Sequence, residues 1–116
     1  MKRILLCLMV ALFATGCLFA KNNDEKMNVM SYNIRYDNSG DKDNQWKFRR
    51  DFAADLVKFY EADVFGAQEV LNNQLNDLLN RLPEYAYVGV GREDGKTKGE
   101  YAPIFYRKDR FSVERS

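Results

Sequence analysis

Two short apolar segments decide the fold: MNVMSYNI at residues 27–34 and ADVFGAQEV at residues 62–70. Both are rich in apolar, β-branched and aromatic residues without helical spacing, which is typical of short buried strands. The first strand is expected to end near Asn33 and the second near Glu69. Between them, apolar residues recur at steps of three and four, which predicts a helix over residues 45–60. A strand, a helix and a strand in this order predict a right-handed unit with two parallel strands.

The same spacing predicts which face of the first helix is buried. Asn44 is the expected N-cap, and Trp46 at the helix start is interpreted as a packing anchor rather than a platform for nucleic-acid bases. The charged side chains are expected on the solvent side. The side chains expected in the core are mainly aromatic and aliphatic: Phe48, Phe52, Ala53, Leu56, Val57, Phe59 and Tyr60.

Four further elements follow along the chain. Leucines at helical spacing predict a second helix from about Asn72, and Pro83 is expected to end it. Two strands at residues 85–90 and 101–107 are expected to flank the loop GREDGKTKG, with Tyr101 and Tyr106 mainly in the core. A last strand is expected to begin near Phe111. The element order predicts an α/β fold.

The composition describes one small domain without a dominant charge. The chain has 116 residues, of which 46% are hydrophobic and 30% charged, and its formal net charge is +1. No basic field is therefore available to hold nucleic acid by charge alone. The sequence contains no histidine, the side chain most often used as an acid or base near neutral pH. An enzyme built from this chain must work without imidazole or be incomplete.

The first twenty residues have the pattern of an export signal. Lys2 and Arg3 precede an apolar run at residues 4–14, and small residues follow it, which predicts a signal peptide over residues 1–20. An uncleaved membrane anchor is the alternative. Export would place the protein in a bacterial periplasm, on an outer membrane as a lipoprotein, or outside the cell.

Two cleavage sites fit this segment. The string ATGC at residues 14–17 resembles a bacterial lipobox, in which Cys17 would be lipidated and would attach the chain to a membrane. Cleavage after Ala20 is the other possibility. Both cysteines, Cys7 and Cys17, lie within this segment, so the remainder of the chain carries no thiol nucleophile and forms no disulfide.

Asn33 and Glu69 are the candidate site residues. Parallel strands end on the same edge of a sheet, and ligands of open α/β sheets bind outside those carboxyl ends. A Glu69 carboxylate there suits Mg²⁺, which prefers oxygen ligands, and Asn33 could position a water molecule or a phosphate oxygen. The alternative interpretation is that Glu69 is a solvated strand end and Asn33 a turn former.

Three segments together resemble a known family. They are MSYNIRYDN, ADVFGAQEV and YVGVGREDGKTKGEYAPIFYRKDRF, and they are similar to the opening third of the endonuclease/exonuclease/phosphatase family, which includes deoxyribonuclease I. The resemblance covers residues 27–116. It implies part of a deoxyribonuclease I-like α/β sandwich, namely the β-α-β-α-β-β portion of a four-layer fold that is truncated at its carboxyl end.

The resemblance also implies the chemistry. Glu69 would ligate a catalytic Mg²⁺ (or Mn²⁺), and Asn33 would orient the nucleophile or belong to the metal site as a further ligand. Some relatives carry Asp two residues after this Asn. Here Arg35 occupies the position and could meet a phosphate or be a surface cation. In the loop at residues 89–99, the resemblance makes Arg92 and Glu100 possible substrate contacts, whereas the residues alone predict a flexible connector.

The resemblance therefore predicts a fragment of a metal-dependent phosphoesterase that is inactive alone, because the family's further Asp, Asn and His residues lie in later segments. The substrate class stays open among sphingolipids, nucleic acids, sugar phosphates and inositol phosphates. A non-catalytic exported or lipid-anchored binding module derived from that fold is the competing hypothesis. The acidic turn at residues 37–43 does not match a calcium loop and is predicted to be solvated.

Overall fold

The computed structural model describes residues 26–115. Its elements, in chain order, are β1 (Val29–Asn33), the 3₁₀ helix η1 (Ser39–Asn44), α2 (Trp46–Phe59), β2 (Val64–Gln68), α3 (Asn72–Arg81), β3 (Tyr85–Val88) and β4 (Ile104–Arg107). The predicted α/β fold is confirmed. The predicted signal peptide and the lipidation site at Cys17 lie outside the described residues.

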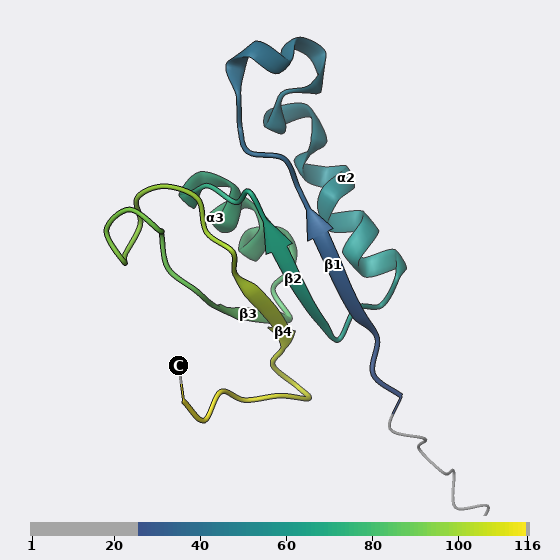
Figure 1. The fold of residues 1–116 in the computed structure, drawn as a ribbon. Coiled ribbons are helices and arrows are strands. Elements are labelled where there is room, and N and C mark those ends of the chain that lie inside the picture. Colours follow the sequence, from purple (N-terminus) through teal and green to yellow (C-terminus); the bar gives the residue numbers. More distant parts are fainter. Residues whose placement is uncertain (1–25, 116) are drawn as a thin grey trace, which may run out of the picture.

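The four strands form one sheet in the order β1-β2-β4-β3 (Figure 1). β1 and β2 are parallel, with Asn33 opposite Gln68, whereas β4 is antiparallel to both β2 and β3. The predicted parallel pair is thus confirmed. Both arrowheads point to the same edge of the sheet in Figure 1, and this carboxyl edge is where Asn33 and Glu69 lie.

The two α-helices cover one face of the sheet (Figure 1). Alternation along the strands points Phe65, Ala67 and Phe105 into this layer, because successive side chains of a strand point to opposite faces. The rings of Phe65 and Phe105 are stacked, with centroids 4.5 Å apart. On the other face of the sheet, Val29 and Ile104 are exposed.

The predicted second helix is confirmed in extent and orientation. Leu75, Leu78 and Leu82 are buried, and α3 ends just before Pro83. Trp46 at the start of α2 is buried, as expected of a packing anchor, and its indole Nε1 donates a hydrogen bond to Oδ2 of Asp77 at 2.8 Å. This contact joins the two helices.

The predicted buried face of α2 is largely wrong. Phe48, Phe52, Phe59 and Tyr60 are all exposed. Ala53 and Val57 are buried, as predicted. They lie on the side of the helix that carries small side chains, and α2 packs against α3. Two apolar stripes lie on opposite sides of this helix, and spacing alone could not tell which one faces inward. The buried residues of α2 are Trp46, Ala53, Ala54 and Val57.

Two smaller predictions are also wrong. Asn44 is the last residue of η1 rather than a cap, and its carbonyl accepts a hydrogen bond from Nε of Arg49 at 2.6 Å. The N-cap of α2 is Gln45. Within the described residues no strand begins near Phe111, because its backbone N–H donates to the carbonyl of Arg107 and closes a turn at the end of β4.

The two tyrosines expected in the core differ. Tyr101 is buried, as predicted, whereas Tyr106 is only partly buried because it neighbours Phe105 on β4 and so points to the opposite face. Across residues 26–115, neither α-helix is long and apolar enough to cross a membrane.

Candidate metal and phosphate site

The structure brings Asn33 and Glu69 together at the carboxyl edge. Asn33 is the last residue of β1, and Glu69 directly follows β2. Nδ2 of Asn33 donates a hydrogen bond to Oε1 of Glu69, and the two atoms are 2.9 Å apart. The parallel pairing of β1 and β2 produces this contact, because it aligns the ends of the two strands.

The backbone of Glu69 has an unusual conformation. Its φ is 57°, in the left-handed region that residues with a Cβ rarely adopt. This conformation lets the side chain reach across the strand ends, where Oε2 of Glu69 accepts a hydrogen bond from the backbone N–H of Tyr36 at 3.3 Å. Backbone strain of this kind is common at functional sites, so the conformation supports a functional role for Glu69.

The surroundings of Glu69 favour its charged form. The hydrogen bond from Asn33 and, second to it, the N–H of Tyr36 hold the pKa of the Glu69 carboxyl below its usual range. The positive charge of Arg35 acts in the same direction. Glu69 is therefore an ionised carboxylate at neutral pH, as a metal ligand must be.

The hydrogen bonds of Asn33 fix the orientation of its amide. Nδ2 faces the Glu69 carboxylate, and Oδ1 accepts from the backbone N–H of Arg35 at 2.9 Å. If the amide were flipped, its oxygen would face the Glu69 carboxylate oxygen and its NH₂ group would face the Arg35 N–H, and neither pair could form a hydrogen bond. The Asn33 oxygen thus already has one partner, and the structure gives the side chain a positioning contact with Glu69. The role of Asn33 as a metal ligand stays a prediction.

A buried glutamine, which the sequence analysis missed, ties the loops around the site together. Oε1 of Gln74 accepts from the N–H groups of Asp37 and Leu71, both at 3.0 Å, and Nε2 donates to the carbonyl of Arg35 at 2.8 Å. Gln74 therefore links the loop after β1 to the start of α3. Its position in the first turn of α3 was a weak signal, since Gln often reaches back to the N-cap there.

Arg35 is held by a carboxylate close to the site. Its Nε and Nη2 donate to the two oxygens of Asp41 at 3.0 and 2.9 Å. Arg49 lies nearby, and together with Asn44 these residues line a hollow of about 400 Å³. The guanidinium of Arg49 is directed at backbone carbonyls, including that of Ile34 at 2.8 Å. Both arginines thus have protein partners, and contact of Arg35 with phosphate stays a prediction.

Arg92 and Glu100 pair with each other. Nη1 of Arg92 lies 3.2 Å from Oε2 of Glu100, on the loop that joins β3 and β4. Tyr101 pairs with Val70 in an isolated antiparallel bridge. Glu100 directly precedes Tyr101 and Glu69 directly precedes Val70, so both glutamates adjoin this bridge. The loop thus runs beside the carboxyl edge, and the substrate contacts of Arg92 and Glu100 remain a prediction.

Glu69 is one carboxylate rather than part of an acidic cluster. Over residues 26–115, no group of three or more Asp, Glu or Cys side chains is placed to hold an ion. Mg²⁺ is commonly bound by one or two carboxylates, with waters and substrate phosphate as further ligands. An ionised carboxylate at this edge fits such a site as one of its ligands.

Comparison with known proteins identifies the family. No family model matches the chain. A solved endonuclease/exonuclease/phosphatase from Bacteroides vulgatus has 54% sequence identity and a TM-score of 0.72, over 73% of this chain and 33% of that chain. The chain belongs to the endonuclease/exonuclease/phosphatase family. Members of this family generally depend on a divalent metal.

Two other members extend the comparison. The mannosyl-6-phosphatase of Bacteroides thetaiotaomicron has 42% identity and a TM-score of 0.75, over 78% of this chain and 34% of that chain. The CCR4-Not complex 3'-5'-exoribonuclease subunit Ccr4 of Mycosarcoma maydis is 28% identical over 108 residues, which is 77% of this chain and 16% of that protein. The chain spans about a third of the length of the solved family structures that it matches.

Proposed function

We propose that the chain is part of a divalent-metal-dependent phosphoesterase, in which Glu69 is a ligand of Mg²⁺ (or Mn²⁺) and Asn33 positions that ligand. The contact between Asn33 and Glu69 at the carboxyl edge carries this proposal. Family membership supports it, and so does the lowered pKa of Glu69. The second hydrogen bond, from the Tyr36 N–H, fixes the other carboxylate oxygen.

The geometry leaves room for an ion on the carboxylate. An ionised carboxylate has about four lone-pair sites. The hydrogen bonds from Asn33 and Tyr36 use two of them, so Glu69 keeps acceptor capacity while its orientation is held. A bound divalent ion would polarise a phosphoryl oxygen and stabilise the leaving group. The chain's own contribution is an oriented, charged ligand at the carboxyl edge of the sheet.

A sugar phosphate is the substrate class that we propose first. The mannosyl-6-phosphatase is 42% identical to this chain over most of the chain's length, whereas the exoribonuclease subunit is 28% identical. The formal charge of +1 also supplies no field for a polyanion such as RNA. A small phosphomonoester needs only local contacts, and a metal ion with an oriented carboxylate provides these.

Metal binding by Glu69 can be tested on this chain directly. In a Mn²⁺ titration followed by NMR, we expect selective broadening of the amide signals of Asn33, Tyr36 and Glu69, because the ion is paramagnetic. Glu69→Gln should remove the broadening. Glu84→Gln is the matched control, since Glu84 is exposed and lies just before β3, at the other end of the sheet. Broadening that survives Glu69→Gln would exclude Glu69 as a ligand.

Hydrolysis is best tested in a chimera. Residues 27–115 would replace the matching segment of the Bacteroides thetaiotaomicron mannosyl-6-phosphatase, and the chimera would be assayed with mannose 6-phosphate and Mg²⁺. We expect turnover, and a loss of at least about 100-fold in Glu69→Gln, because a metal contributes several kcal/mol to transition-state stabilisation. Glu84→Gln should keep its rate. A folded chimera that binds Mn²⁺ without turnover would favour a non-catalytic binding module.

A further inference from the structure

Helix α2 carries an exposed aromatic face, made of Phe48, Phe52, Phe59 and the following Tyr60. These side chains are 61%, 68%, 77% and 57% exposed. The three phenylalanines lie at steps of four and seven residues, which places them along one side of the helix. The opposite side of α2 packs on the sheet through Ala53 and Val57. Exposed aromatic side chains gathered on one side of a helix are typical of an interaction site.

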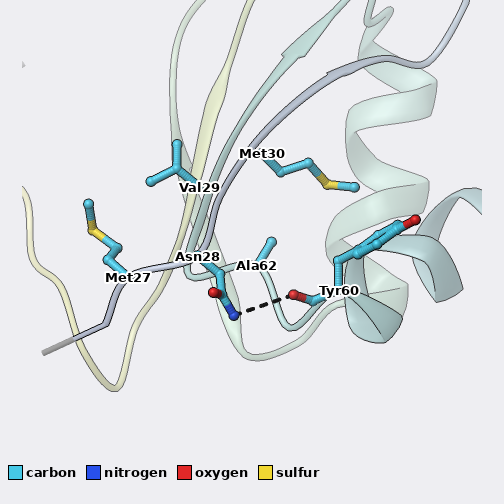
Figure 2. Close-up of a pocket in the computed structure, with 6 residues that line it drawn as sticks. All are labelled: Met27, Asn28, Val29, Met30, Tyr60 and Ala62. Carbon is cyan, nitrogen blue, oxygen red and sulfur yellow. Dashed lines mark hydrogen bonds between the residues drawn. The ribbon is translucent and has the colours of Figure 1, made fainter. Parts of the chain in front are cut away.

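Tyr60, at the end of the aromatic face, also lines a hollow of about 500 Å³, whose lining residues are drawn in Figure 2. Tyr60 forms part of the wall, and its ring meets that of Phe59 edge-on, with centroids 5.2 Å apart. The polar amide of Asn28 in the wall is directed at the carbonyl of Tyr60, 3.5 Å away. The remaining lining residues are apolar: Met27, Val29, Met30 and Ala62.

The charges beside the aromatic face are balanced. Asp51 pairs with Arg81 at 2.5 Å, and Asp55 lies 3.7 Å from Lys58 on the same helix. The ammonium of Lys47 lies 4.8 Å from the centre of the Phe48 ring. Aromatic rings with lysine ammonium groups beside them are typical of helices that lie in the headgroup region of a membrane.

The sequence before the hollow indicates what covers this surface. The chain enters the described part at residues 26 and 27, and Met27 lines the hollow. Residues 4–14 form the apolar run of the predicted export signal. From Ala14 to Met27 the chain can span at most about 45 Å, at about 3.5 Å per residue. If the apolar run stays in a membrane, or if Cys17 is lipidated, α2 is held within reach of the lipid surface; cleavage after Ala20 would remove this tether.

We propose that the aromatic face and the adjoining hollow rest on the surface of the membrane to which the N-terminal segment directs the chain. This contact goes beyond the proposed hydrolytic function and does not depend on it. β1 runs from the hollow to Asn33, so the candidate site lies at the opposite end of this strand. Docking through α2 leaves the carboxyl edge open to soluble substrate.

The contact can be tested by fluorescence quenching with the full chain. The chain would be added to vesicles of phosphatidylethanolamine and phosphatidylglycerol whose acyl chains are brominated, since bromine quenches tryptophan only at close range. Trp46 is 1% exposed and is present in every variant as a common background. The fluorescence of the new tryptophan in Phe52→Trp is the signal that remains after that of Trp46 is subtracted. We expect this signal to be at least twofold lower on brominated vesicles than on vesicles without bromine.

The matched control is Val90→Trp, at an exposed apolar position on the loop after β3. Its added fluorescence should stay unquenched on the same vesicles. Binding to the vesicles without extra quenching of Phe52→Trp would overturn the proposal, as would a chain that does not bind vesicles at all. Dimers in lipid-free sedimentation that Phe52→Ser dissociates would also overturn it, because the aromatic face would then be an interface between copies.

Discussion

At the residue scale, the backbone of Glu69 is as informative as its carboxylate. A glycine would adopt a φ of 57° without steric strain, yet this position holds a residue with a long charged side chain. The conformation turns the carboxylate toward Asn33 and the Tyr36 N–H, and those contacts offset part of the strain. The strand end is therefore shaped to present one carboxylate at the edge of the sheet.

The contact between Asn33 and Glu69 predicts a shift in acidity. We expect Asn33→Ala to raise the pKa of Glu69 toward the ordinary value for glutamate, because the largest cause of its lowered pKa is lost. An NMR titration of the side-chain carboxyl carbon measures this. Asn73→Ala is the matched control, since Asn73 donates to Asp37 instead. Equal pKa values of Glu69 in both variants would contradict the prediction.

The same pKa shift fixes a direction for stability against pH. A carboxyl whose pKa is lower in the folded state stabilises that state above its unfolded pKa of about 4.3. This contribution is lost as the pH falls through the lower pKa of folded Glu69. In Asn33→Ala, whose Glu69 pKa lies closer to the unfolded value, the difference in stability between neutral and acidic pH should shrink, as urea unfolding at a series of pH values can show.

At the element scale, one buried side chain joins the segments that form the site. Gln74 belongs to α3, but its amide bonds to the loop after β1 and to Leu71 just before the helix. Gln74 is fully buried and its three partner groups are part-buried, so water would replace these bonds only in part if the amide were lost. The loop that contains Arg35 and Tyr36 therefore depends on α3 for its position, although the two are distant in sequence.

Gln74→Leu should destabilise the fold by about 1–3 kcal/mol, because it leaves the part-buried backbone groups of Arg35, Asp37 and Leu71 without their partner. Urea unfolding measures this loss, and hydrogen exchange should show faster exchange of the Asp37 amide. Gln45→Leu is the control, since Gln45 is partly exposed at the N-cap of α2. A loss below about 1 kcal/mol would show that other contacts hold the loop.

Elements with strong local signals could be predicted from the sequence. The two parallel strands and α3 follow from apolar runs, a leucine stripe and a following proline. The buried face of α2 could not be predicted, since Phe48 and Phe52 match helical spacing as well as Ala53 and Val57 do. Only the packing of α2 against α3 and the rest of the core selects the side with Ala53 and Val57.

The site was predictable to a similar degree. Asn33 and Glu69 could be brought together because parallel strands share a carboxyl edge. Gln74 could be identified only in part, because its bond with the Leu71 N–H is a local cap contact whereas Arg35 and Asp37 lie in a loop whose path the sequence does not encode locally. The pairing of Arg92 with Glu100 likewise depends on how the loop between β3 and β4 folds back.

At the scale of the whole molecule, stability depends on one layer of side chains between the sheet and its two helices. Phe65 lies at the centre of this layer, fully buried, stacked on Phe105 and edge-on to Tyr85 at 5.6 Å. It connects β2 with β4 and β3. The exposed aromatic face of α2 lies outside this layer, so two phenylalanines of the same fold should differ sharply in their contribution to stability.

We therefore expect Phe65→Ala to lower the free energy of unfolding by about 3–5 kcal/mol, as is typical of a buried phenylalanine. Phe52→Ala, on the exposed side of α2, should change it by less than about 0.5 kcal/mol. Urea unfolding of both variants measures the difference. Because a small domain has only about 5–15 kcal/mol of stability, Phe65→Ala should also unfold at a markedly lower temperature. Equal losses in the two variants would mean that α2 packs through its aromatic face, which would also remove the basis for its contact with a membrane.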